Sequence, residues 1–228
     1  MAEAPASRLP LLLCWLSPAF PVGAFAYSHA VEWAVEAGDV HDEGSLAAWL
    51  LAVLRDGAGR SDVILLAASY RAGEAGDTEA LDAVNDFALA LAPSGELRLE
   101  TAQQGRSFLS AARAAWPAGA LESLLIARPE TAYPVAFGAV AAAHGVPLPE
   151  AVHGFLTAFA GNLVSAGIRL APVGQTAGQR VLARLLPALD VVAAEAIEAE
   201  LDDIASVTFR ADLGSLRHET QYTRLFRS

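Results

Sequence analysis

The sequence predicts an all-α fold, a single compact bundle of about ten helices with a short C-terminal tail. Apolar residues recur at helical spacing along most of the chain, and no segment shows the alternation of a half-buried strand. Prolines and glycines fall between the periodic segments, where helices end. Hydrophobic residues make up 54% of the 228 residues, which is enough for a sizeable core.

The helices of the N-terminal half are placed by their apolar faces and by their end residues. The first ends at a glycine, and Ser45 is expected to cap the second. The second helix either continues past residues 57–59 or breaks there and restarts. A glycine-containing loop is expected at residues 71–76, and Asp77 or Thr78 should cap the helix that follows. The expected helices of this half occupy residues 27–37, 45–54, 63–70, 78–91 and 96–116.

The helices of the C-terminal half are bounded mainly by prolines. Pro134 and Pro149 suit the first turn of a helix, where a missing backbone N–H costs nothing. Residues 176–179 form a capping-box pattern, and Pro187 should end or kink the helix that starts there. A turn is expected at residues 93–95. The expected helices of this half occupy residues 121–126, 134–144, 149–168, 176–186 and 191–204, the last with acids along one solvated side.

The charge and cysteine content exclude several classes of protein. The net charge is −11, and a protein this acidic repels the phosphates of nucleic acids and of anionic membranes. We therefore expect neither as a partner. Cys14 is the single cysteine, so no intramolecular disulfide can form, which suits the cytoplasm. Its apolar neighbours predict a position in the core.

The N-terminal region resembles a signal peptide only superficially. Residues 9–31 carry no charge, but Glu3 stands where a signal peptide would be basic. Pro18 and Pro21 interrupt the apolar run, so it cannot be a membrane-spanning helix. We expect neither export nor a membrane span. The expected organisation is an N-terminal arm and loop at residues 1–26, an all-helical domain at 27–206 and a C-terminal tail at 207–228.

No group of residues predicts catalysis or a metal site. No two histidines lie three to five residues apart, so no single helix presents a pair of metal ligands. The acidic cluster at residues 41–43 is expected to be a solvated turn. Nucleophile-elbow, phosphate-loop and dinucleotide motifs do not occur in the sequence. We therefore expect no catalytic residue, no bound metal and no cofactor.

Two loops have less generic compositions. Residues 17–25 hold two prolines and a glycine, which fix the path of the chain, with two phenylalanines beside them. This loop either packs on the body as an arm or forms a shaped surface for a partner. In the second loop, residues 168–176, Arg169 ends an otherwise uncharged helix, where its charge compensates the helix dipole.

The end of the chain is a basic segment on an acidic protein. Residues 216–228 contain three arginines and one glutamate, together with Tyr222 and Phe226. Arginine and aromatic side chains are enriched in protein interfaces. If the segment is helical, Arg217 and Arg224 share one face. It either contacts a partner, which we expect, or packs on its own acidic body.

Short motifs along the whole chain resemble the UreF family of urease accessory proteins. The matching residues are Ser17-Pro18, Pro21-Val22-Gly23-Ala24-Phe25, Tyr27-Ser28, Tyr133-Pro134-Val135-Ala136-Phe137-Gly138, Leu163-Val164-Ser165-Ala166, Arg169-Leu170, Gly174-Gln175-Thr176, Gly178-Gln179-Arg180, Arg217-His218-Glu219, Tyr222 and Arg224-Leu225-Phe226-Arg227-Ser228. They follow one another in the order that the family shows. Ala26 and Ala30 stand where the family has Ser and Gly, and both exchanges keep a small side chain.

The resemblance implies a helical, dimeric and non-catalytic protein. It implies a complex with the accessory protein UreD (also called UreH), the GTPase UreG and the urease apoenzyme, in which nickel is placed in the urease active site as UreG hydrolyses GTP. An alternative is an allosteric activator or gate of UreG, with Arg169 or Gln175 stabilising charge in the partner's active site. The residues expected to contact partners are Arg217, His218, Tyr222, Arg224, Phe226, Arg227, Pro21, Gly23, Phe25, Tyr27, Arg169 and Gln175.

Overall fold

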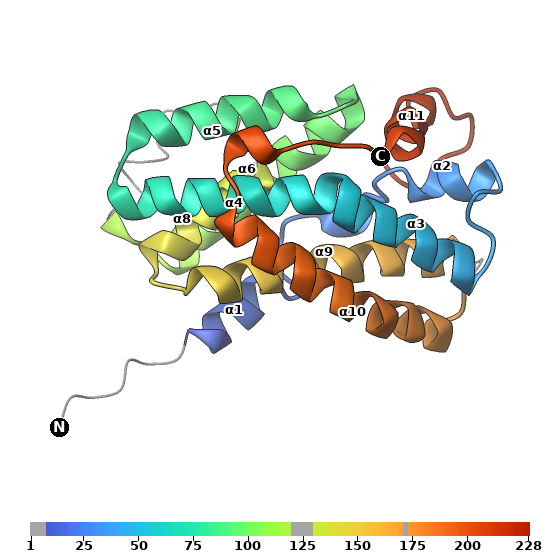
Figure 1. Ribbon diagram of the computed structural model, residues 1–228, viewed down its shortest axis with the longest axis horizontal. Helices are drawn as coiled ribbons and strands as arrows, with labels where there is room; N and C mark the ends of the chain where they lie inside the picture. The colour runs from blue at the N-terminus through green and yellow to red at the C-terminus, as the bar shows by residue number, and fades with distance from the viewer. Residues whose placement is uncertain (1–7, 120–129, 171–172) are drawn as a thin grey trace.

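The computed structural model describes residues 8–119, 130–170 and 173–228. Within these residues the chain forms α-helices and two short 3-10 helices and no strand, so the expected all-α fold is confirmed (Figure 1). The helix expected at residues 121–126 lies outside the described residues. The elements are α1 (Leu9–Trp15), η1 (Ala24–Ala26), α2 (Val31–Glu36), α3 (Glu43–Asp56), α4 (Ala58–Ala75), α5 (Thr78–Leu91), α6 (Gly95–Ala115), α8 (Tyr133–Ala143), α9 (Leu148–Arg169), α10 (Gln175–Glu198), η2 (Leu201–Asp203) and α11 (Phe209–His218).

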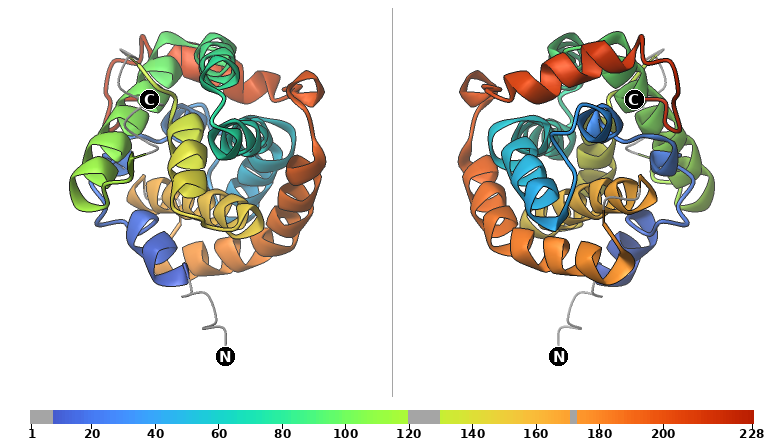
Figure 2. Two further views of the ribbon diagram at one scale, coloured as in Figure 1. Left: turned by 90° about the vertical axis from the view of Figure 1, so that its left-hand side faces the viewer. Right: turned by 90° about the vertical axis from the view of Figure 1, so that its right-hand side faces the viewer.

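Helix α4 occupies the centre of the bundle and packs against α3, α5, α8, α9 and α10 (Figures 1 and 2). Its closest neighbour is α8, and Gly138 allows the approach. A Cβ atom at Gly138 would lie 2.1 Å from the Ser69 hydroxyl and 2.4 Å from the Leu66 carbonyl oxygen. Next to this contact, Trp15 of α1 meets the rings of Phe108 and Phe137 edge-on. The helices therefore share one continuous core.

Several helix ends agree with the sequence expectations. The Asp77 carboxylate caps α5 by accepting a hydrogen bond from Ala80 N at 2.9 Å. Helix α8 has Pro134 in its first turn and is followed by Gly145 with φ +62°. Of the two alternatives beyond α3, the structure shows the break, at Gly57.

Three features of the N-terminal half differ from what the sequence patterns indicated. The arm contains a helix, α1, because Leu12 and Trp15 lie one turn apart and both are buried. Helix α2 begins at Val31 and not at residue 27, because His29 and Ala30 have left-handed backbone conformations. Cys14 is exposed, since it lies on the outer face of α1.

Two further helix boundaries of this half differ. Asp42 and not Ser45 is the N-cap of α3, and Ser45 completes a capping box by bonding back to the Asp42 backbone. The loop expected at residues 71–76 is reduced to Gly76, because α4 continues to Ala75 and buries Ala72 against the core. A left-handed φ of +68° at Gly76 then ends the helix.

The two helices expected on either side of Pro187 are one helix, α10. Pro187 removes one backbone donor, but Leu185 and Leu189 bury the same face of the helix before and after it. This face packs on α3, α4 and α9, which holds the helix together. The capping box expected at residues 176–179 is absent, because the helix begins earlier, after Gly174, with no side-chain cap.

Helix α9 is the one described helix that is long and apolar enough to cross a membrane by length and composition. Half of its most apolar window is buried inside the protein, and core helices pass the same test. Its packing against α3, α4 and α10 accounts for its apolar sequence.

The end of the chain packs on the body. Helix α11 lies against α2 and α6, and residues 219–228 continue as irregular backbone toward the start of α2 (Figure 1). The segment is therefore not helical beyond His218, and Arg217 and Arg224 do not share a helix face. Helix α1 lies on the opposite side of the molecule from this end of the chain (Figures 1 and 2).

Candidate functional site at the C-terminal junction

The three segments singled out in the sequence meet at one place, which we call the C-terminal junction. It consists of residues 24–32, residues 96–103 of α6, Arg169 and residues 218–228. The carboxylate of Glu32, buried in the first turn of α2, accepts hydrogen bonds from Leu225 N at 2.6 Å and from Phe226 N at 2.9 Å. A buried carboxylate thus fixes the backbone of the segment.

His218 ties the end of α11 to two other helices. Its Nε2 lies 3.1 Å from a carboxylate oxygen of Glu32, and its Nδ1 lies 2.6 Å from one of Glu96. The guanidinium of Arg224 donates to the other oxygen of Glu96. The His218 side chain is completely buried, so its own two contacts with Glu32 and Glu96 are shielded from water.

The last two residues bind the loop before α2. Arg227 N donates to the carbonyl of Ala26 at 2.9 Å. The carbonyl of Ser228 accepts from Ser28 N at 2.9 Å and from the Ser28 hydroxyl at 2.5 Å. The Ser228 hydroxyl donates to Glu100 at 2.5 Å. Ser228 is therefore almost fully buried between the loop before α2 and α6.

Arg169, the last residue of α9, joins the loop to the segment through its guanidinium. The guanidinium carbon lies 3.7 Å from the centre of the Phe25 ring and 4.1 Å from that of the Phe226 ring. Its Nε and Nη2 are buried and have no hydrogen-bond partner among the residues that the structure describes. Burial lowers the pKa of Arg169 below its usual value. Both ring faces stabilise the charge of this partly buried guanidinium.

The expected contact residues fall into two groups. His218 and Phe226 are buried and hold the segment, and Tyr27 is buried with its hydroxyl donating to Gln103. Tyr222 and Phe25 project into solvent, Tyr222 completely. The remaining exposed members of the set are Arg217, Arg224, Arg227, Pro21, Gly23 and Gln175.

Pro21, Gly23 and Gln175 make no hydrogen bond to the segment in the described part of the chain. Gly23 has φ +78°, a left-handed conformation that a glycine adopts without strain. Gln175 is the first residue of α10. The structure therefore brings together Phe25, Tyr27, Arg169 and the C-terminal residues of the expected set, but not these three.

Sequence reasoning missed the acids that hold the segment, which are Glu32, Glu96 and Glu100. The sequence did contain an indication of them, because a basic segment that packs on an acidic protein is expected to pair with acidic side chains there. Glu96 and Glu100 lie four residues apart, so they share one face of α6. Glu32 is the first charge after a long uncharged run.

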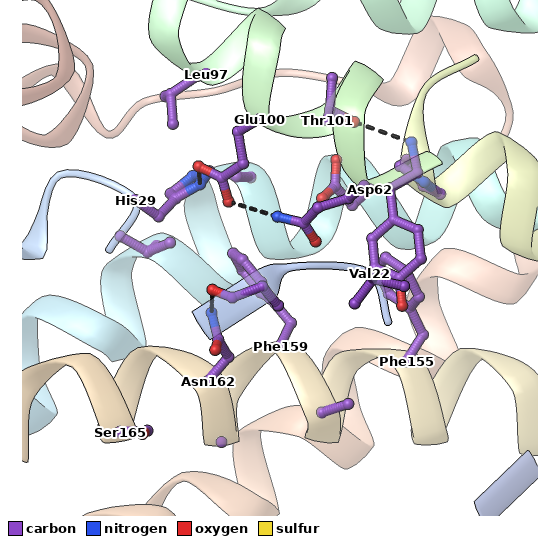
Figure 3. Close-up of a pocket in the computed structure, with 18 of the residues that line it drawn as sticks. Val22, His29, Asp62, Leu97, Glu100, Thr101, Phe155, Phe159, Asn162 and Ser165 are labelled. Carbon is purple, nitrogen blue, oxygen red and sulfur yellow. Dashed lines mark hydrogen bonds and ion pairs between the residues drawn. The ribbon is translucent and has the colours of Figure 1, made fainter. Parts of the chain in front are cut away.

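A cavity of about 570 Å³ adjoins the junction (Figure 3). Its walls come from residues 15–29 and from α4, α6 and α9 and are mostly apolar. At its polar end, Glu100 accepts a hydrogen bond from Gln104 at 3.1 Å and lies 3.6 Å from His29. Asp62 and Asp212 complete this polar end.

The polar end of the cavity favours protonated groups. Burial raises the pKa of Asp62 to about 7, partly opposed by His29 and reinforced by Glu100. Burial by itself would lower the pKa of His29, but the Glu100 carboxylate together with Asp62 and Asp212 raises it above its usual value. Among the described residues, no group of three or more His, Cys, Asp or Glu side chains is arranged to hold a metal ion.

Comparisons with known proteins give one consistent result. A sequence model of the UreF family matches residues 40–186. The urease accessory protein UreF of Xanthobacter autotrophicus is 60% identical over 228 residues, covering all of this chain and 93% of the relative. That of Azorhizobium caulinodans is 59% identical over 231 residues, covering all of this chain and 99% of the relative. That of Methylobacterium radiotolerans is 56% identical over 229 residues, covering both chains completely.

Proposed function

Because the chain belongs to the UreF family of urease accessory proteins, we propose that it is a non-catalytic scaffold in the maturation of urease. In this role it binds the accessory protein UreD (UreH), the GTPase UreG and the urease apoenzyme in the cytoplasm. The complex inserts nickel, its cargo, into the urease active site as UreG hydrolyses GTP. The scaffold acts as a homodimer.

The exposed side of the C-terminal junction supports this role. Phe25, Tyr222 and Leu225 are 68%, 102% and 65% exposed, although each has a large apolar side chain. Arg217 and Arg227 lie in the same segment and are exposed. Exposed aromatic and arginine side chains on a rigid base are typical of binding hot spots. The partner surface is therefore expected to be apolar with an acidic rim.

The buried contacts give the segment its rigidity. Because Glu32 and His218 hold the segment, the backbone that carries the exposed side chains is ordered before a partner binds. A preordered segment loses less conformational entropy on binding than a free one. His218 and Phe226 then act as anchors of the docking surface, and Tyr222, Leu225 and Phe25 make the contact.

The position of Arg169 favours the scaffold over a GTPase activator. An arginine that stabilises charge in a partner's active site must extend from the surface. Here the guanidinium lies between two phenylalanine rings, with two of its nitrogens buried. Gln175 is exposed, so it could reach a partner's active site as the GTPase-activator alternative requires. Experiment has to test that alternative.

The proposal is tested by deleting residues 217–228 and co-expressing the chain with UreD, UreG and the urease subunits. The expected result is a folded, helical protein that no longer co-purifies with UreD and fails to support nickel-dependent urease activation. If the shortened chain still formed the full complex, the segment would not be the docking surface for UreD. Single-turnover GTP hydrolysis by UreG, with and without the chain, tests the alternative, since a scaffold leaves the rate unchanged.

A further inference from the structure

The imidazole ring of His218 lies between two carboxylates. Its Nδ1 lies 2.6 Å from an oxygen of Glu96, and its Nε2 lies 3.1 Å from an oxygen of Glu32. The ring is completely buried, and the side chains of Glu32 and Glu96 are 7% and 16% exposed. A neutral imidazole carries one N–H, so it can donate to only one of two acceptors. Both contacts are therefore hydrogen bonds only if the three side chains together hold one proton more than a neutral ring and two carboxylates do.

The neighbours of the two carboxylates favour the ring as the place of this extra proton. Glu32 also accepts hydrogen bonds from the backbone N–H groups of Leu225 and Phe226. Glu96 also accepts one from the guanidinium of Arg224. Donors of this kind stabilise the ionised form of a carboxylate. With an imidazolium at position 218, two negative and two positive side chains balance one another, as charges removed from water require.

The charged groups that face the ring come from the elements packed against α11. Helix α2 contributes Glu32, and α6 contributes Glu96. Arg224 of the C-terminal segment pairs with Glu96. Near the ring in the sequence, Arg217 is exposed and Glu219 accepts a hydrogen bond from the backbone N–H of the first residue of α6 at 2.9 Å. The charge of the ring therefore decides whether this buried group is balanced.

We propose that the extra proton on His218 is a latch for the C-terminal segment, which loosens from α2 and α6 when the ring loses that proton as the pH rises. Without the proton, one ring nitrogen presents its lone pair to a carboxylate oxygen at a distance that only a hydrogen bond makes favourable. The group then has one uncompensated negative charge in a site shielded from water. Movement of His218 away from the two acids relieves it, and residues 219–228 follow His218 directly in the chain.

The latch is a property of the isolated chain. Its consequence for docking rests on the proposed function, because the exposed side chains of Tyr222 and Leu225 belong to the segment that the latch holds. Under that function, binding of UreD weakens over the same pH range in which the segment loosens. A segment that loosens without any change in the binding of UreD would leave the latch in place and count against the docking surface.

The protonation state of His218 is tested in the unchanged chain by nuclear magnetic resonance. Histidine labelled with ¹⁵N in the ring gives different long-range ¹H–¹⁵N spectra for the imidazolium and for each of the two neutral tautomers. The signals of His218 are identified by their absence from the spectrum of His218→Gln. At neutral pH both ring nitrogens of His218 should carry a proton. A neutral His218 ring at this pH overturns the proposal.

The loosening is tested by amide hydrogen exchange of the peptide that contains Leu225 and Phe226, at a series of pH values and corrected for the exchange rate of an unstructured peptide. Its protection should fall about tenfold or more as the imidazolium signal disappears, while a peptide from α8 loses less. In His218→Gln, whose side chain does not ionise, the protection of the segment should not depend on pH. The control His41→Gln removes an exposed histidine and should behave as the parent chain does. Constant protection of the segment while the ring loses its proton, or an equal loss in α8, overturns the proposal.

Discussion

The guanidinium carbon of Arg169 lies 4.1 Å above the Phe226 ring, although the two residues belong to segments that the sequence separates widely. The Phe25 ring covers the opposite face at 3.7 Å. One side chain therefore joins the end of α9, the loop before α2 and the C-terminal segment. Because Arg169 is only partly buried, its contact with the Phe226 ring is expected to contribute about 1–2 kcal/mol to holding the segment on the body.

Arg169→Lys should loosen the segment while keeping the charge. An ammonium group cannot stack flat between two rings as the planar guanidinium does. Amide hydrogen exchange of the peptide that contains Leu225 and Phe226, followed by mass spectrometry, should become about tenfold faster. Arg180→Lys changes an exposed arginine that pairs with Glu43 and should leave this peptide unaffected. Equal protection of the peptide in all three proteins would contradict the role of the stack.

Glu32→Gln should destabilise the fold through the junction. The neutral amide keeps one acceptor oxygen, but its NH₂ group faces the donors of the segment or of His218. The expected loss is about 2–3 kcal/mol in the free energy of unfolding, because hydrogen bonds to a buried charge are stronger than neutral ones. Urea unfolding followed by circular dichroism measures it.

Glu36→Gln is the matched control, since Glu36 lies on the same helix and is exposed. Its free energy of unfolding should stay within about 0.5 kcal/mol of the parent chain, as is usual for surface substitutions. A similar loss in both variants would mean that the junction contacts contribute nothing beyond the charge of α2.

The elements that the sequence predicted well are those set by local signals. Asp77 and Pro134 mark helix starts by short-range chemistry, and the structure has both where expected. Left-handed backbone at His29 and continuation of α10 through Pro187 depend instead on distant packing, which no local pattern contains. The motifs pointed to Phe25, Arg169 and Phe226 separately. Only the three-dimensional structure shows that these residues meet, and that Glu32, Glu96 and Glu100 hold the segment there.

The stability of the protein should fall as the pH rises from about 4 to 7 and further above 6.5, because Asp62 and His29 both have raised pKa values in the folded state. A group with a raised folded pKa adds stability below its unfolded value, and that stability is lost as the pH rises through the folded value. For Asp62 the window runs from its usual value of 3.8 to about 7. For His29 it begins at 6.5 and extends upward.

Asp62→Asn should remove the larger part of this dependence. At pH 8 the variant should be more stable than the parent chain by up to about 4 kcal/mol, and near pH 4 the two should differ little. Urea unfolding at a series of pH values provides the measurement. Parallel pH curves for the two proteins would show that Asp62 ionises in the folded state as freely as in the unfolded one.

The division of the segment into anchors and contact residues predicts two different phenotypes. The double variant Tyr222→Ala with Leu225→Ala removes exposed side chains only, so its free energy of unfolding should stay unchanged while co-purification with UreD weakens about tenfold or more. Phe226→Ala should lower both the free energy of unfolding and the co-purification with UreD, because the buried Phe226 ring holds the segment that carries the exposed contact residues. Val207→Ala is the control for losing an exposed apolar side chain elsewhere and should affect neither. If the double variant binds UreD as well as the parent chain does, the contact with UreD lies on another face of the protein. The C-terminal junction would then contribute to the stability of the fold only.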